Sequence, residues 1–261
     1  KWEEGDMREY AVHFWDELNS QSPNFRNQFS SYKQYGAASM DILLKPYDTT
    51  GMLVLKANYS LTSYAENLGN SHFALRPLPK PVQIAPVNGI VATDINSDGN
   101  LDVVMTGNDY GNEVFSGRYD ASTGIVLLGD GGGKFQPLTS LKSGFRVKGD
   151  AKALAKLRSV SGEELLIATQ NLDSLRVFRN NNNKELQRFF RASPSDNWAQ
   201  LHHESGRNKK VEFYFGSGYL AQSTRSIFVP ATVSKIIVHD FKGNQRSLGY
   251  DQLAIAANGN P

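Results

Sequence analysis

The pattern of apolar positions changes near residue 50 of this chain. Before that point, Tyr10, Phe14 and Leu18 recur every four positions, a spacing that predicts a helix with one apolar face. After it, short apolar runs such as Leu53–Ala57 are bounded by turn residues, which predicts strands. We therefore expect a small helical segment over residues 1–50 and a mainly β fold beyond it.

Proline, serine and glycine mark where these elements begin and end. Serine caps helices and proline favours the first helical turn, so Ser22-Pro23 predicts the start of a second helix, and Gly36 predicts its end. The proline-rich stretch 76–81 cannot sit in a central strand. We interpret it as a loop between sheets.

Three units of short strands end in similar Gly/Asn-rich hairpins, at residues 67–73, 129–135 and 177–184. Phe73 and Phe135 lie 62 positions apart, and Lys134 and Lys184 lie 50 apart. A repeat of this period is typical of β-propeller blades. We therefore predict a partial propeller over residues 51–187, with about three blades where a closed ring needs at least four. Beyond it, alternation without the hairpin predicts a C-terminal antiparallel β unit, residues 188–261.

The most informative motif is the nine-residue stretch 94–102, DINSDGNLD, which joins two predicted strands. Oxygen-bearing residues occupy its first, third, fifth, seventh and ninth positions, and Gly99 permits a sharp turn. This spacing suits Ca²⁺, which takes about 6 to 8 oxygen ligands. The predicted ligands, with the seventh position acting through its backbone carbonyl, are Asp94, Asn96, Asp98, Asn100 and Asp102.

One alternative interpretation bears on that motif. A polar hairpin turn without metal would look similar, although it needs far fewer carboxylates. Residues 157–163 stand at the matching place in the third unit and lack the carboxylates, so we expect one calcium loop. The glycine run 129–133 is no phosphate loop, because it leads into Phe135 and not into a Lys-Ser/Thr pair and a helix.

Composition further limits the functions, partners and locations that this chain can have. The chain has no cysteine, which excludes thiol catalysis and disulfides. No apolar run approaches the roughly 20 residues needed to cross a bilayer. Residues 174–261 carry 12 Lys and Arg against 6 Asp and Glu, but these are dispersed, so we predict no nucleic-acid partner. The calcium loop favours an extracytoplasmic location, and the chain reads as a piece of a longer protein.

Residues 90–102 with hairpin 127–135 resemble the FG-GAP/VCBS repeats of integrin-like β-propellers. Residues 181–248, which include GSGYLAQS at 216–223, resemble the ASPIC/UnbV domain that follows such repeats in cartilage acidic protein-like and bacterial surface proteins. The N-terminal helices resemble, more weakly, an insertion in Bacteroidetes-type surface proteins. The resemblance implies propeller blades with structural calcium at the same five residues, and it implies no particular activity.

A binding module explains these features better than an enzyme. Neighbouring strand residues point to opposite faces, so His202-His203 cannot chelate one ion together. Gly216-Ser217-Gly218 lacks the strand-to-helix setting of a nucleophile.

The loop 108–120 gathers aromatic and polar side chains next to the calcium loop, and such loops suit recognition. An equally open interpretation is that it packs internally between blades. The predicted contact residues, the last of them in the 216–220 bend, are Tyr110, Arg118, Tyr119 and Tyr219. We expect a calcium-stabilised adhesion module for a glycan or protein; the alternatives are a secreted hydrolase and a purely structural scaffold.

Overall fold

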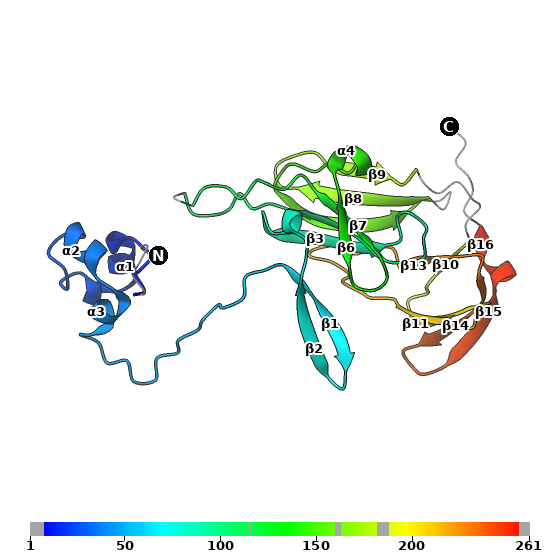
Figure 1. Cartoon of the computed structure of the whole chain (residues 1–261), viewed down its shortest axis with the longest axis horizontal. Coiled ribbons are helices and arrows are strands. Elements are labelled where there is room, and N and C mark those ends of the chain that lie inside the picture. The colour runs from blue at the N-terminus through cyan, green and yellow to red at the C-terminus, as the bar shows by residue number, and fades with distance from the viewer. Residues whose placement is uncertain (1–7, 115, 160–162, 182–187, 256–261) are drawn as a thin grey trace. The chain divides into compact units, whose positions relative to one another are not determined.

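The computed structural model describes residues 8–114, 116–159, 163–181 and 188–255 (Figure 1). The chain forms two compact units, Lys1–Ser60 and Leu61–Pro261. As predicted, the protein is mainly β, with several antiparallel sheets and a few short helices. In the described ranges, no helix has the length and apolar character to cross a bilayer. Residues 182–184, the end of the third predicted hairpin, lie outside these ranges.

The first unit contains short helices, and they begin later than the apolar spacing predicts. The elements are α1 (Trp15–Gln21), η1 (Pro23–Phe25), α2 (Tyr32–Ala37) and α3 (Met40–Leu44). The first helix starts only at Trp15 because the Glu17 carboxylate accepts the Phe14 N–H at 2.9 Å and caps the chain there. Tyr10 lies outside the helix and forms a β-bridge with Ser39.

The second predicted helix is also displaced. Only one 3-10 turn follows Ser22, and Gly36 lies inside α2 rather than at its end. A stronger start signal stands at Ser31, whose hydroxyl accepts the Gln34 N–H at 3.3 Å. The apolar side chains still form a small core around Phe29, Ala38 and Leu43.

The strand predicted over Leu53–Ala57 is not formed. These residues have no ladder partner, and Leu53 and Leu55 are 79% and 82% exposed. The hairpin that follows is found where its turn residues predict it, as β1 (Ser63–Gly69) and β2 (His72–Pro77), and η2 (Lys80–Val82) then ends the proline-rich stretch.

The next two sheets are antiparallel meanders. The first has the order β3-β4-β5-β6 and the second β7-β8-β9, so chain neighbours are also sheet neighbours. Their strands are β3 (Val87–Thr93), β4 (Asp102–Gly107), β5 (Ile125–Gly129), β6 (Phe135–Leu138), β7 (Ala151–Arg158), β8 (Glu164–Gln170) and β9 (Arg176–Arg179), with α4 (Ser140–Ser143) between the sheets in sequence. Strand β7 packs against β3 and β4 (Figure 1).

The contact between these sheets requires a glycine. A Cβ on Gly89 would lie 2.7 Å from the Leu154 Cβ, closer than any side chain tolerates. Leu154 can therefore pack beside Val91, Val104 and Ala168 in one buried cluster, which joins the two sheets through apolar contact.

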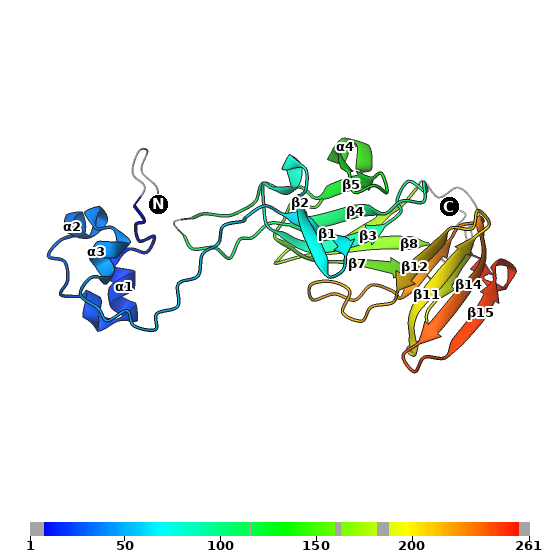
Figure 2. The ribbon, with the colours of Figure 1, turned by 60° about the horizontal axis from the view of Figure 1, so that its bottom comes forward.

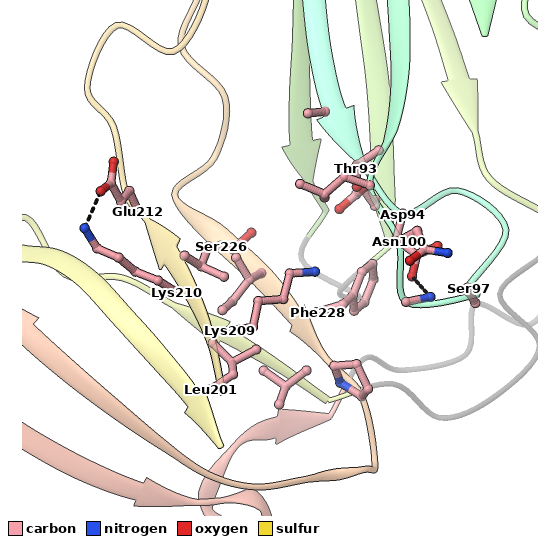
Figure 3. A pocket seen from close by; sticks show the side chains of 18 of the residues that line it. Thr93, Asp94, Ser97, Asn100, Leu201, Lys209, Lys210, Glu212, Ser226 and Phe228 are labelled. Atoms are coloured by element: carbon pink, nitrogen blue, oxygen red, sulfur yellow. Dashed lines mark hydrogen bonds and ion pairs between the residues drawn. The ribbon is translucent and has the colours of Figure 1, made fainter. Parts of the chain in front are cut away.

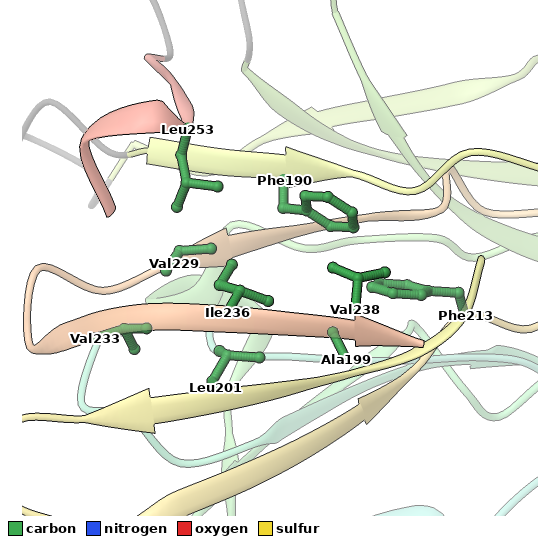
Figure 4. Packing of buried hydrophobic residues seen from close by; sticks show 9 residues of the cluster. All are labelled: Phe190, Ala199, Leu201, Phe213, Val229, Val233, Ile236, Val238 and Leu253. Atoms are coloured by element: carbon green, nitrogen blue, oxygen red, sulfur yellow. The ribbon is translucent and has the colours of Figure 1, made fainter. Parts of the chain in front are cut away.

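The C-terminal part is built from two more antiparallel sheets. Their orders are β13-β10-β16 (Figure 1) and β12-β11-β14-β15 (Figure 2). The strands are β10 (Arg188–Arg191), β11 (Asp196–His203), β12 (Asn208–Glu212), β13 (Ser226–Val229), β14 (Val233–Asp240), β15 (Gln245–Gly249) and β16 (Ala254–Ile255), and η3 (Tyr250–Gln252) precedes the last. Alternate residues of both sheets form one apolar core, including Ala199, Leu201, Ile236 and Val238, which are 0–3% exposed (Figure 4). The described residues 188–255 are therefore antiparallel β, as their alternation predicts.

Strand β7 is joined to this C-terminal part at its free edge. The Thr224 N–H donates to the Lys156 carbonyl at 2.7 Å, and the Lys156 N–H donates to the Ser223 hydroxyl at 3.0 Å. The Arg158 side chain continues the junction, because its Nε donates to the Ser226 hydroxyl and its guanidinium lies 3.9 Å from the Phe228 ring centroid. The segment before β13 thus covers an edge that would otherwise be open.

An ion pair between buried Asp196 and the more exposed Arg246 fixes the corner of the C-terminal core. The Asp196 side chain is fully buried and accepts both Arg246 nitrogens, at 2.5 and 2.7 Å, and the Ser193 N–H at 2.7 Å. Burial alone would raise the pKa of this carboxyl, but these hydrogen bonds outweigh it and the net pKa lies below the usual 3.8.

We predict that Asp196→Asn lowers the free energy of unfolding by about 2 kcal/mol at pH 7, because it removes charge-assisted hydrogen bonds. A lowered folded-state pKa stabilises the protein above the unfolded value and loses that effect as pH falls through the folded value. The difference in free energy of unfolding between wild type and variant should therefore become smaller below about pH 3.8. Urea unfolding at several pH values measures this; a difference that stays constant down to pH 2 would contradict it.

Candidate functional site

The predicted calcium loop connects β3 to β4, as its flanking apolar runs indicate. Its side chains fold inward onto the loop's own backbone. Asp94 accepts the Gly99 N–H at 2.8 Å and the Asp98 N–H at 3.2 Å, and Asp98 accepts the Asn100 N–H at 2.8 Å. The Asn96 side-chain oxygen also accepts the Asp98 N–H, at 3.2 Å. Gly99 has φ +88°, a left-handed conformation that the sharp turn requires.

Three predicted ligands therefore lie around one short turn, and two of them have opposite pKa shifts. Burial raises the pKa of Asp94 above its usual value, and the nearby Asp98 carboxylate adds to this, against the N–H groups of Gly99, Ser97 and Asp98. The backbone N–H of Asn100 lowers the pKa of Asp98. A half-buried carboxylate beside a second carboxylate is an environment in which a cation would be stabilising.

Asp102 has a different role from the other predicted ligands. Its side chain is fully buried, and its two oxygens accept the Ile95 N–H at 2.8 Å and the Gly129 N–H at 2.9 Å. It thereby ties the start of the loop to the end of β5. Each oxygen keeps a further lone pair, so this role is compatible with ligation but does not depend on it.

The predicted ligands have the donor atoms that calcium prefers, but their carboxylates are not gathered around one point. The Asp94, Asn96 and Asp98 side chains supply the hard oxygen atoms that calcium prefers. In the part of the chain that the structure describes, no three Asp, Glu or His side chains gather closely enough to hold a metal. The Asn100 side chain faces Gly131, where an added Cβ would lie 2.4 Å from its oxygen, so only its carbonyl is suited to a ligand role.

The glycine-rich turn between β5 and β6 packs against the predicted calcium loop. An added Cβ on Gly129 would lie 2.2 Å from the Leu101 carbonyl oxygen, and one on Gly133 would lie 2.5 Å from the Tyr64 hydroxyl. That hydroxyl donates to the Gly133 carbonyl at 2.8 Å. The glycines thus have packing roles in the sheet.

The second predicted site, the loop 108–120, is anchored at its base by Asn108. This side chain is fully buried; its amide donates to the carbonyls of Ser122, Lys148 and Gly149 at 2.9–3.1 Å, and its oxygen accepts the Ser122 N–H. Asp109 and Tyr119 then exchange two backbone hydrogen bonds of 2.9 Å. The loop is therefore held at the same end of the sheet as the β6–β7 connection.

A polar pocket of about 600 Å³ opens beside this loop. The Arg118 guanidinium lies 4.7 Å from the Tyr110 ring centroid, so the structure brings these two predicted residues together. Lys152 lies in the same pocket and is 2.6 Å from Asp150 and 3.4 Å from Asp109. The hydrogen bond with Asp150 is the main reason that the pKa of Lys152 is raised, so this lysine is held as a cation.

The other two predicted contact residues are not part of that pocket. Tyr119 is 48% exposed and joins the loop through its backbone, and Tyr219 is 56% exposed in the bend closed by Gly218 and Ala221.

Sequence reasoning missed Lys152, Asn171 and Asp173, which also line the pocket. The repeat contained a signal for Asn171, because it follows β8 as Asn108 follows β4. The two N–H groups make equivalent bonds, to Asp150 and Pro86 respectively.

Comparison with known proteins adds no further constraint: no family model matches this chain, and no curated protein is significantly similar to it.

We predict that Asp102→Asn destabilises the protein by about 1–3 kcal/mol, with or without calcium, because an amide nitrogen would then face a buried N–H donor. Asp130→Asn is the matched control, since Asp130 accepts the Gly132 and Lys134 N–H groups in an exposed turn. Chemical unfolding in the presence of a calcium chelator measures the stability of both variants. Equal stability of the two variants would contradict the anchoring role of Asp102.

Proposed function

We propose that this chain is a calcium-stabilised extracytoplasmic binding module of the β-propeller type. The sheets β3–β6 and β7–β9 correspond to blades of FG-GAP/VCBS type, and residues 188–261 to an ASPIC/UnbV-like domain. The meander order of both sheets supports this, as does the equivalent placement of Asn108 and Asn171. The free strand edges that the described sheets retain suggest further blades in a larger parent protein.

Calcium is proposed as a structural ion in the β3–β4 loop. Asp94, Asn96 and Asp98 would hold it through side-chain oxygens and Asn100 through its carbonyl, while Asp102 fixes the ends of the loop and is the remaining candidate ligand. When bound, the ion would neutralise the adjacent Asp94 and Asp98 carboxylates. Such loops need a calcium-rich compartment, which favours a secreted, periplasmic or cell-surface location.

The ligand is proposed to be a glycan or a protein at the cell surface. The observation that carries this proposal is the Tyr110–Arg118 pair, which forms one wall of a polar pocket held by a rigid sheet. An aromatic ring beside fixed charged and amide groups suits the alternating apolar and hydroxyl faces of a sugar, or a polar protein surface.

We predict that calcium raises the melting temperature of the purified chain. At a free concentration of about 100 times Kd the added stability is about 2.7 kcal/mol, which corresponds to about 5–10 °C in a domain of this size. Asp98→Ala should abolish the increment, whereas Asp130→Ala, outside the predicted ligand set, should retain it. Melting curves in chelator and in calcium decide the matter; identical curves for the wild type would rule the site out.

For ligand binding, we predict that a glycan array identifies binders whose affinity falls about tenfold in Tyr110→Ala. The double variant Tyr110→Ala/Tyr119→Ala should show the same calcium-dependent rise in melting temperature as the wild type. If Tyr219→Ala weakens binding and Tyr110→Ala does not, the contact surface lies in the 216–220 bend. If the chain hydrolyses an array glycan, the enzyme alternative replaces this proposal.

A further inference from the structure

A second, larger cleft lies against the predicted calcium loop, between β3 and the C-terminal sheets (Figure 3). The Tyr110 pocket is at the opposite end of β4, so the loop 108–120 is not next to the calcium loop as the sequence suggested. Its volume is about 1320 Å³. Residues of β3, β12 and β13 line it, together with the loop residues Asp94 and Asn100. No residue of the Tyr110 pocket contributes to it, so the cleft is a separate candidate site.

The lining also includes residues of β7, β8 and β11, but β3, β12 and β13 share one property: each is the terminal strand of its sheet. β3 pairs only with β4, β12 only with β11, and β13 only with β10 among the described strands. Each therefore presents backbone N–H and C=O groups without a ladder partner on one side. Such an edge is a template for an added strand.

Strand β12 is the best exposed of these edges. The Phe213 N–H donates to the Asn197 carbonyl at 2.8 Å, and the His203 N–H donates to the Arg207 carbonyl at 2.9 Å. Antiparallel pairing alternates, so the backbone groups of Lys210 and Glu212 point away from β11. An approaching chain would find two donors and two acceptors at regular spacing there.

The side chains at the cleft indicate what kind of chain fits. Lys209 is half-buried and extends across the cleft toward Phe228 in Figure 3, and it forms no ion pair with any described acidic residue. Ile90 and Phe228 provide apolar surface nearby. This combination suits an extended segment that carries one acidic and some apolar side chains.

We propose that this cleft binds an extended peptide, which adds as a strand to the free edge of β12 and places an acidic side chain beside Lys209. The proposal rests on the proposed binding function and identifies the protein partner as a flexible, acidic-apolar segment. Main-chain hydrogen bonds to β12 supply affinity, and Lys209 with the apolar surface supplies selectivity. A saccharide in the same cleft would not use the regular backbone spacing.

The test uses the full chain in calcium and a phage library of random 12-residue peptides, from which enriched peptides are resynthesised with a fluorescent label. Lys210→Pro removes one outward N–H and keeps the inward bonds to β11, a position where edge strands tolerate proline. Lys210→Ala is the matched control, because it removes the same side chain and keeps the N–H. Fluorescence anisotropy should show binding at least about tenfold weaker in Lys210→Pro and within about twofold of wild type in Lys210→Ala.

Two further measurements keep the proposal testable if Lys210→Pro is unstable. In the wild type, the bound peptide should slow hydrogen exchange of the Lys210 and Glu212 amides. Lys209→Gln should reduce the preference for peptides with Asp or Glu about tenfold. The absence of any enriched peptide, equal binding by the proline and alanine variants, or unchanged exchange at β12 overturns the proposal.

The outcomes also separate this proposal from the proposed function. If peptides bind but Arg118→Ala abolishes binding and Lys210→Pro does not, the ligand lies in the Tyr110 pocket; the binding function then stands and the strand-addition site is wrong. If neither peptides nor array glycans bind, both fail. Peptide binding that responds only to the β12 and Lys209 variants supports both.

Discussion

The arrangement of the candidate calcium loop depends on one buried carboxylate. Asp102 accepts one N–H from the loop and one from the end of β5, and so links the loop to two strands at once. The hydrogen bond to Asp102 holds Gly129 against the loop. Only glycine fits at this position, because a Cβ would collide with the Leu101 carbonyl oxygen. The Asp94, Asn96 and Asp98 oxygens are thereby positioned by the protein's own hydrogen bonds.

A second constraint acts at the junction of β7 with the C-terminal part. Glu164 lies between Lys156 at 3.4 Å and Arg158 at 3.3 Å, and its carboxylate also accepts the Thr93 hydroxyl at 2.9 Å from β3. Burial lowers the pKa of Arg158, and Glu164 opposes that effect. This network connects both sheets to the segment before β13. It closes one edge of β7 and leaves the edges of β3, β12 and β13 lining a common cleft.

Local signals in the sequence predicted the features that depend on nearby residues. The strands on both sides of the calcium motif and the Asn67–Phe73 hairpin follow from turn chemistry and period-two patterning, and the structure contains them. The apolar alternation over 210–215 predicted a longer strand than the structure has: β12 ends at Glu212, and Tyr214 and Phe215 are both exposed. The helix boundaries were wrong, because capping by Glu17 and Ser31 outweighed the apolar spacing. A predicted strand at Leu53–Ala57 failed because a strand needs a partner that local sequence does not specify. For the same reason, the roles of Asp102 and Lys152 could not be predicted: their partners lie up to 43 positions away.

The β3–β4 loop is proposed to bind calcium. Its donors are the right type, and burial together with the neighbouring Asp98 carboxylate raises the pKa of Asp94. Equilibrium dialysis of the purified chain against radioactive calcium tests this most directly, because it counts bound ions and does not depend on any effect on folding. The account predicts one ion per chain, displaced by excess cold calcium. Less than a tenth of an ion per chain at millimolar calcium would contradict it.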